Sequence, residues 1–244
     1  MCPMGIDIAS LVSQARHGMF KAGLVPHELA AVTERARREG SPLGATPRVF
    51  KDRCEWLADE HEVEITIDKP RAEVLCAMSS IEIMKYPDSV VATARIMRHV
   101  GADWTFRLDG YEATNFGLLT GDAAAQKELT LKIIHAAVAC GASVVVLPEC
   151  GHAYTALRWM GANMYGKPLP FRVLHIAEFL AEQVRAGKLS LRRLGKSARP
   201  KSSSSSTFAC AAAAWWPFTA PMNCGTRCSR SRWNRSSRPA PSCR

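Results

Sequence analysis

Apolar residues recur every three or four positions in the first part of the chain, as they do on one face of an α-helix. This pattern predicts two helices between residues 6 and 39, separated by a glycine-containing break. Residues 48–58 predict a third, shorter helix. In contrast, Val63-Glu-Ile-Thr-Ile67 alternates apolar and polar residues, which is typical of a β-strand, and Asp68-Lys-Pro70 would end it.

The pattern changes at residue 72, where short apolar runs begin to alternate with helical periods. Strands are predicted at 73–78, 103–106, 143–147 and 171–176, and helices at 88–100, 122–140, 151–159 and 177–187. We expect Asp88 to cap the first of these helices and Gly141 to end the second. Because a helix follows each strand, the order predicts an α/β fold with a parallel sheet and flanking helices over residues 72–190.

The chain of 244 residues has 32 Lys and Arg against 22 Asp and Glu, but the excess is confined to its end. Residues 197–244 contain eight basic residues and no acid. The nearly neutral remainder gives no electrostatic indication of nucleic-acid binding. The same segment has serine and alanine runs without periodicity, so we predict that 197–244 is a disordered tail. No apolar run reaches the roughly 18–20 residues of a membrane span.

Five of the nine cysteines lie in the body of the chain: Cys2, Cys54, Cys76, Cys140 and Cys150. No secretion signal is recognisable, so these cysteines are expected to be free thiols or metal ligands rather than disulfides. Cys140 closes an alanine-rich helical face and is predicted to lie in the core. Cys54 has no ligand partner nearby in the sequence.

Residues 148–154, Pro-Glu-Cys-Gly-His-Ala-Tyr, follow the most apolar predicted strand and open a helix. Ligands of open α/β sheets bind beyond the carboxyl ends of strands, and a helix N-terminus would favour a thiolate at Cys150. Cys150 and His152 therefore fit a metal-ligand pair or a nucleophile with its base. A buried structural cysteine beside a capping histidine fits the spacing equally well.

Cys76 ends another predicted strand, although its position fits a small core residue equally well. The loop 109–117 follows the strand at 103–106. Its polar residues suit a binding loop, an ordinary turn also fits, and it has no glycine-rich phosphate-binding motif. Because parallel strands end at one edge of a sheet, we predict that Cys76, this loop and Cys150 converge there.

Four stretches of the sequence resemble the cysteine-rich (CCG) domain proteins whose type is the B-subunit of heterodisulfide reductase. They are Val-Leu-Cys-Ala-Met-Ser-Ser at 74–80, Asp-Gly-Tyr-Glu-Ala-Thr-Asn-Phe-Gly at 109–117, the segment 148–159 and the segment 163–175. The likeness covers residues 2–196. It is strongest to the catalytic iron–sulfur subunit of the membrane complex associated with dissimilatory sulfite reductase.

The resemblance implies how the chain is divided. In that family two ferredoxin-type [4Fe–4S] sites precede two CCG half-domains. Residues 1–58 would then be a helical segment that follows a ferredoxin-type domain, and 59–196 would be the first CCG half-domain. The chain would have begun within a longer gene or lost the preceding domain, because Cys2-Pro3 is similar only to the last ligand of a ferredoxin repeat.

The resemblance also implies a set of ligands. Cys2, Cys76 and Cys150 become candidate metal ligands, with Cys76 and Cys150 at a [4Fe–4S] cofactor site and Cys150 as the catalytic residue. His152 is assigned to orienting the site or capping its helix, because thiolates dominate iron–sulfur coordination. The paired cysteines of the family do not occur in 109–117, so we expect the cluster to be absent or incomplete in this chain.

The second half-domain that the resemblance leads one to expect does not follow residue 196. The genetic code allows Cys210–Gly225 to be read in a shifted frame as a glycine run followed by residues similar to the family's second half-domain. We therefore expect 197–244 to be an out-of-frame translation and the chain to be a truncated copy. Nucleotide sequence without an open shifted frame would refute this.

The activity implied by the resemblance is electron transfer and reduction of a disulfide or trisulfide in sulfur or sulfite metabolism. A small sulfur-carrier protein would be the substrate, and membrane cytochrome and iron–sulfur subunits would be the partners. The location would be cytoplasmic, with membrane association through those subunits and no nucleic-acid partner. Three interpretations stay open: an iron–sulfur oxidoreductase subunit in truncated form, a cluster-free protein in which the Cys150 thiol acts alone, and a structural remnant.

Overall fold

The computed structural model describes residues 5–191, which begin with three helices. These are α1 (Ile8–Lys21), α2 (His27–Glu39) and α3 (Pro47–His61). Asp7 caps α1 by accepting a hydrogen bond from the Ser10 amide at 3.2 Å, and Gly40 ends α2 in the left-handed conformation with φ at 81°. Both helices predicted between residues 6 and 39 are therefore confirmed, and α3 is longer than the predicted 48–58.

Four short strands form one sheet. They are β1 (Val74–Cys76), β2 (Trp104–Thr105), β3 (Val144–Leu147) and β4 (Arg172–His175). Their order in the sheet is β2-β1-β3-β4, and every neighbouring pair is parallel. Each observed strand lies within a predicted one, so the predicted α/β fold with a parallel sheet is confirmed.

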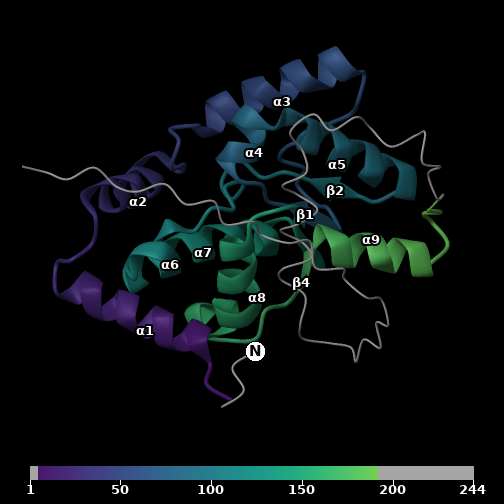
Figure 1. The fold of residues 1–244 in the computed structure, drawn as a ribbon. Coiled ribbons are helices and arrows are strands. Elements are labelled where there is room, and N and C mark those ends of the chain that lie inside the picture. The colour runs from purple at the N-terminus through teal and green to yellow at the C-terminus, as the bar shows by residue number, and fades with distance from the viewer. Residues whose placement is uncertain (1–4, 192–244) are drawn as a thin grey trace, which may run out of the picture. The chain divides into compact units, whose positions relative to one another are not determined.

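Helices connect and follow the strands in chain order (Figure 1). They are α4 (Ser80–Lys85) and α5 (Pro87–Val100) after β1, α6 (Phe116–Thr120) and α7 (Ala123–Ala139) after β2, α8 (Gly151–Tyr165) after β3, and α9 (Ile176–Arg185) after β4. No helix within residues 5–191 is long and apolar enough to cross a membrane.

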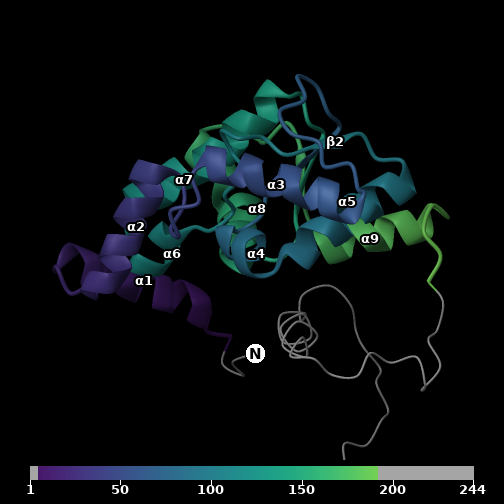
Figure 2. The same ribbon diagram turned by 90° about the horizontal axis from the view of Figure 1, so that it is seen from above.

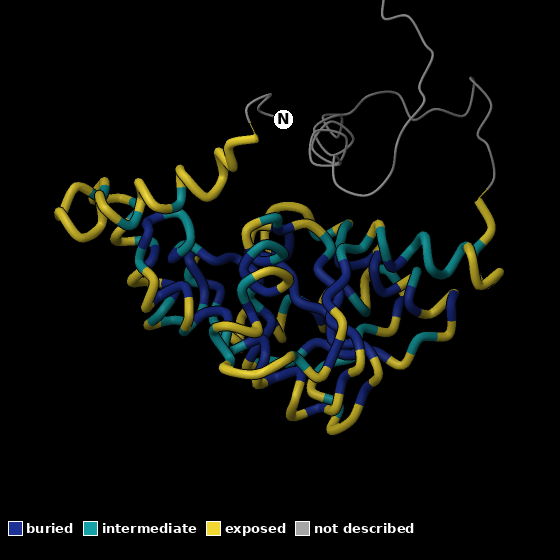
Figure 3. Tube along the Cα trace, turned by 90° about the horizontal axis from the view of Figure 1, so that it is seen from below, coloured by how far each residue is buried: buried dark blue, intermediate teal, exposed yellow. Residues whose placement is uncertain are grey.

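Alternate strand residues point to opposite faces of the sheet and build two separate cores. Val74 and Val146 pack on the face covered by α3, α5 and α9. Leu75 and Val145 pack on the other face, which α7 and α8 cover. The resulting layers of helix, sheet and helix are seen from above in Figure 2, and Figure 3 shows that the buried segments gather between them.

An aromatic cluster fastens α3 to the chain that follows β2. The Phe50 ring stacks on Tyr111 with ring centres 4.4 Å apart and meets the edge of Phe106 at 5.3 Å. The Tyr111 hydroxyl donates a hydrogen bond to the Ala45 carbonyl. The cluster therefore holds the start of the loop 109–117 in place beside the sheet.

Three details of the sequence prediction are wrong. The segment 63–67 forms only a single bridge, Ile67 with Phe106, because the chain turns away at Asp68 in the left-handed conformation with φ at 52°. Asp88 is not a cap, since Pro87 already occupies the first turn of α5 and Tyr86 stands at its N-cap. The short helices α4 and α6 were not predicted, because five or six residues are too few for a helical period to be recognised.

Two predictions concern residues that the structure does not describe. Cys2 and the tail 197–244 both lie outside residues 5–191. The division of the chain at residues 58 and 196 also stays a prediction.

Candidate functional site

The central strands β1 and β3 lie side by side, but the chain leaves them toward opposite edges of the sheet. β1 connects to β2 on one side, and β3 connects to β4 on the other. At such a point the two loops after the strands diverge and leave a crevice where ligands bind in this class of fold. The loops here are residues 77–79 and 148–150, which contain or adjoin several ionisable groups.

The loop after β1 holds a buried carboxyl group. Ser79 and Glu82 form a capping box at the start of α4, in which Glu82 Oε2 accepts a hydrogen bond from the Ser79 amide at 3.1 Å. The Glu82 side chain is only 2% exposed. Burial, together with the charge of Glu149, raises the pKa of Glu82 to about 7, although the bonds from Ser79 oppose this shift. Glu82 is therefore poised between its protonated and ionised forms near neutral pH.

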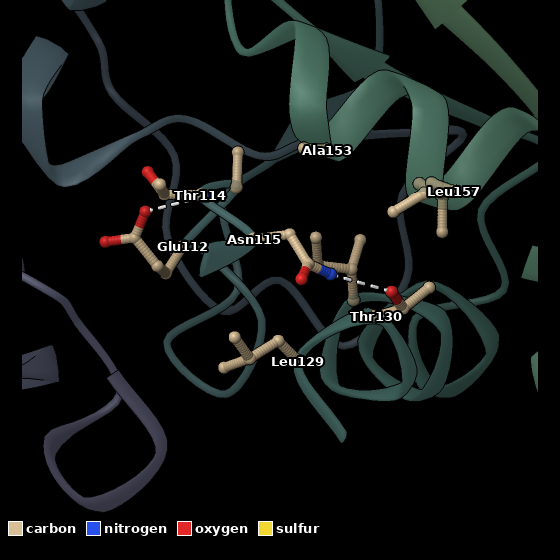
Figure 4. A pocket seen from close by; sticks show the side chains of 10 residues that line it. Glu112, Thr114, Asn115, Leu129, Thr130, Ala153 and Leu157 are labelled. Atoms are coloured by element: carbon tan, nitrogen blue, oxygen red, sulfur yellow. Dashed lines mark hydrogen bonds between the residues drawn. The ribbon is translucent and has the colours of Figure 1, made fainter. Parts of the chain in front are cut away.

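A second carboxyl group, Glu112, reaches the same place from the loop 109–117. Glu112 pairs with Met78 in a parallel bridge, which brings the loop beside the end of β1. Its carboxyl accepts hydrogen bonds from the amides of Ser80 at 3.2 Å and Thr114 at 2.8 Å. Burial raises the pKa of Glu112, and these bonds partly oppose the shift. Figure 4 shows Glu112 and Thr114 at one end of a shallow hollow of about 200 Å³.

Three buried oxygen atoms around these carboxyls have no hydrogen-bond partner within the described part of the chain: Ser80 Oγ, Glu82 Oε1 and Thr114 Oγ1. A buried polar group without a partner costs about 1–3 kcal/mol, so native proteins rarely leave several together. This end of the sheet therefore has unused capacity to bind a polar group or water.

Cys150 lies on the other side of the switch point, at the N-cap of α8. Its side chain is 5% exposed. Burial raises the pKa of Cys150 to about 11, to which the charges of Glu149 and Glu112 contribute, while the amides of Ala153 and His152 lower it. Burial thus outweighs the helix N-terminus, contrary to the expectation that this position favours a thiolate. The Cys150 thiol is protonated at neutral pH and has two carboxyl groups in its electrostatic neighbourhood.

His152 is neutral in this environment. Burial, followed by the positive charge of Arg16, lowers the pKa of His152 below its ordinary value. The N-cap residue of α8, Cys150, makes no side-chain capping bond either. The assignment of His152 to orienting the site stays a prediction.

Cys76 and Cys150 lie at the same edge of the sheet but on opposite faces. Cys76 is fully buried in the core beneath α3 and α5, whereas Cys150 belongs to the core beneath α7 and α8. Burial raises the pKa of Cys76 well above its usual range. In this arrangement the two thiols do not fit as ligands of one cluster. Their ligand roles, and that of Cys2, stay predictions.

The described residues contain no group of three or more His, Cys, Asp or Glu side chains placed to hold a metal ion. Cys54 and Cys140 are buried and lie in opposite cores, and Cys140 is in the core as predicted. All four described cysteines are free thiols.

Much of the loop 109–117 has a structural role. The Asn115 amide donates hydrogen bonds to the Gln126 carbonyl at 3.1 Å and to Thr130 Oγ1 at 2.9 Å, and its oxygen caps α6. Gly117 lies against the backbone of Gln126 so closely that a Cβ atom would overlap it. The loop is therefore fastened to α7, and Glu112 is the residue through which it reaches the candidate site.

Sequence reasoning missed the carboxyl groups of Glu82, Glu112 and Glu149 as members of the site. A signal for one of them was present, since Ser79-Ser-Ile-Glu82 has the spacing of a capping box directly after a strand. Glu112 and Glu149 lie inside segments that the sequence had marked, but nothing local to the sequence shows that their charges act on Cys150.

Comparison with known proteins finds similar iron–sulfur subunits. The chain is 27% identical to the Hdr-like menaquinol oxidoreductase iron-sulfur subunit 2 of Archaeoglobus fulgidus over 165 residues, which cover 63% of this chain and 30% of that protein. The chain is similar to Hdr-like iron–sulfur subunits. The Hdr-like menaquinol oxidoreductase iron-sulfur subunit of Archaeoglobus profundus is also 27% identical over 165 residues, covering 63% of this chain and 29% of that protein.

A third relative carries the name of a heterodisulfide reductase. It is the D-subunit of the dihydromethanophenazine:CoB–CoM heterodisulfide reductase of Methanosarcina barkeri, which is 24% identical over 196 residues that cover 78% of this chain and 45% of that protein. The chain thus spans less than half the length of each of these relatives. No family model matches the chain, and no solved structure matches it.

Proposed function

We propose that the chain is part of an Hdr-like electron-transfer subunit that takes part in thiol–disulfide reduction in sulfur or sulfite metabolism. The observation that carries the proposal is the placement of the Cys150 thiol and the carboxyls of Glu82, Glu112 and Glu149 around the switch point of the sheet. The names of the similar subunits support the same chemistry. The resemblance to [4Fe–4S] proteins makes Cys2, Cys76 and Cys150 the ligand candidates.

The proposal assigns proton handling to the residues of this chain. Reduction of a disulfide to two thiols consumes two electrons and two protons, and the electrons would come from membrane cytochrome and iron–sulfur partner subunits. Glu82, with its pKa raised to about 7, can hold or release a proton at neutral pH. Cys150 would form a mixed disulfide with the substrate, a small sulfur-carrier protein, and release the other half as a thiol. The complex would be cytoplasmic and attached to the membrane by its partners.

A second candidate is a cluster-free thiol protein. The observation that favours it is the position of Cys76 and Cys150 on opposite faces of the sheet. In this case Cys150 exchanges with disulfides without any cluster. The two candidates share the chemistry of Cys150 and differ only in whether iron is bound.

Disulfide exchange at Cys150 tests the shared chemistry. The full chain is treated with 5,5′-dithiobis(2-nitrobenzoate), and the released thiol and the modified residue are followed. Glu149→Gln and Glu112→Gln each remove a charge that raises the pKa of Cys150, so both should speed its modification at fixed pH. Cys54→Ala is the matched control, because Cys54 is fully buried and away from the switch point. Unchanged kinetics in Cys150→Ala would show that another thiol reacts and remove the proposed role.

Iron and acid-labile sulfide analysis after anaerobic purification separates the two candidates. We expect little or no iron in the chain as it stands, because the described cysteines do not converge. Iron present in proportion to the chain, lost in Cys150→Ala and kept in Cys54→Ala, would favour the iron–sulfur subunit. Stoichiometric iron that survives Cys150→Ala would remove the ligand role of Cys150.

A further inference from the structure

The helix α1 turns its apolar side away from the protein. Only Ser13 and His17, one turn apart, are half-buried, and they lie on the side of α1 toward α6. Leu11 is 62% exposed and Ile8 is 58% exposed, although such residues normally lie against the core in an amphipathic helix. Figure 3 shows α1 as an exposed segment at the rim of the described chain.

The exposed residues form a continuous stripe, here called the α1 arc. It consists of Ile8, Leu11, Val12, Ala15 and Met19, whose spacing of three and four residues places them on one helical face. The arc extends over about 16 Å, given a rise of about 1.5 Å per residue. Ile6 before the helix and Leu24 after it continue the exposed apolar surface, at 55% and 64% exposure.

The charge around the α1 arc has one sign. No acidic residue occurs between Ile8 and His27, whereas Arg16 and Lys21 lie within the helix. Arg16 is one turn from Val12 and so borders the arc. The one acid nearby, Asp7, precedes the helix and accepts a hydrogen bond from the Ser10 hydroxyl at 2.7 Å. An apolar stripe bordered by positive charge complements a surface that is apolar below and negatively charged above.

We propose that the α1 arc binds the surface of a membrane that contains anionic lipids, with α1 lying in the plane of the interface. The apolar side chains would enter the acyl boundary, and Arg16 and Lys21 would meet the lipid phosphates. Because the polar side of α1 is attached to α6, the helix can lie flat without leaving the protein. This attachment is peripheral, and it does not depend on the thiol chemistry proposed above.

Two other occupants fit the α1 arc less well. A second copy of the chain, paired across a two-fold axis near Ala15, would place two Arg16 side chains against each other. A protein partner is usually anchored by Trp, Tyr or Arg at the centre of the contact, whereas the centre of the arc holds only aliphatic residues and Met19. A lipid surface requires no such anchor and accepts the convex face of a helix.

Vesicle co-sedimentation of the full chain tests the proposal. The vesicles are phosphatidylcholine alone or with about 30 mol % phosphatidylglycerol, an anionic lipid. Leu11→Asp places a charge in the arc at an exposed position, so the fold should be kept, as circular dichroism would check. We expect this variant to bind the anionic vesicles at least about tenfold more weakly than the unmodified chain. Leu43→Asp is the matched control, since Leu43 is 46% exposed and outside α1.

The comparison of variants is essential because residues 197–244 carry eight basic residues and no acid. This segment is present in every variant and would bind anionic vesicles through its charge alone. Equal binding by Leu11→Asp and the unmodified chain would assign binding to such charges and overturn the proposal. A chain that stays in the supernatant would also overturn it. So would a dimer in sedimentation velocity that Leu11→Asp dissociates, which would make the α1 arc an interface between copies.

Discussion

Replacement of Glu82 by glutamine should make the stability of the protein less dependent on pH. Glu82 is 2% exposed, and burial raises its pKa from 4.5 to about 7. Glutamine has nearly the same shape and can make the same capping-box bond to the Ser79 amide, because Gln also serves at this helix position. Glu82→Gln therefore removes the ionisation while leaving the local structure in place.

The sign follows from proton linkage. A carboxyl group whose pKa is raised on folding binds its proton more tightly in the folded protein than in the unfolded chain. Its contribution to stability is complete below about pH 4.5 and is lost as the pH rises through about 7. One pKa unit corresponds to about 1.4 kcal/mol, so the whole loss is about 3 kcal/mol. About 2.5 kcal/mol of this loss falls between pH 5 and pH 8.

Urea unfolding followed by circular dichroism at pH 5, 6, 7 and 8 measures this difference. We expect the free energy of unfolding of Glu82→Gln, relative to the unmodified protein, to rise by about 2.5 kcal/mol across this range. Glu178→Gln is the matched control, because Glu178 holds the equivalent position in the capping box of α9 but is only half-buried. A difference between Glu82→Gln and the unmodified protein that stays constant with pH would refute the reasoning.

Two further substitutions test the packing around the loop 109–117 by urea unfolding. Gly117→Ala should destabilise the protein by about 2 kcal/mol or more, because its Cβ would overlap the backbone of Gln126, whereas Gly151→Ala meets nothing within 4 Å and should be tolerated. Equal effects of the two would contradict this. Tyr111→Phe should cost about 1–2 kcal/mol, because it leaves the Ala45 carbonyl without its hydroxyl donor, and a neutral result would show that water replaces the bond.

The secondary structure was largely predictable because its signals are local. The run at 143–147 is apolar throughout, and Asp122 caps α7 where the sequence places its start. The prediction of a strand at 63–67 failed because a strand needs a partner along its length. The chain supplies only one bridge to Phe106 before turning at Asp68. Alternation of residue types shows that a segment can pair, but not that a neighbour is available.

The candidate site was predictable only in part. Cys150 and the loop 109–117 follow strands, and the rule that parallel strands end at one edge places both there. The burial that raises the pKa of Glu82 and Cys150 was not predictable, because it depends on helices packed from distant parts of the chain. The helix N-terminus at Cys150 was visible in the sequence, but the desolvation that outweighs it was not.

The sequence by itself determined which segments are helices, which are strands, and that the strands run parallel. Only the tertiary structure decided which way each side chain faces. Cys76 and Cys150 both follow from the strand pattern, yet the register of the sheet places them in opposite cores. The apolar stripe of α1 is equally plain in the sequence, yet α1 attaches by Ser13 and His17 and leaves the stripe exposed. Periodicity defines a face relative to its own helix or strand, and only packing against the rest of the chain orients that face.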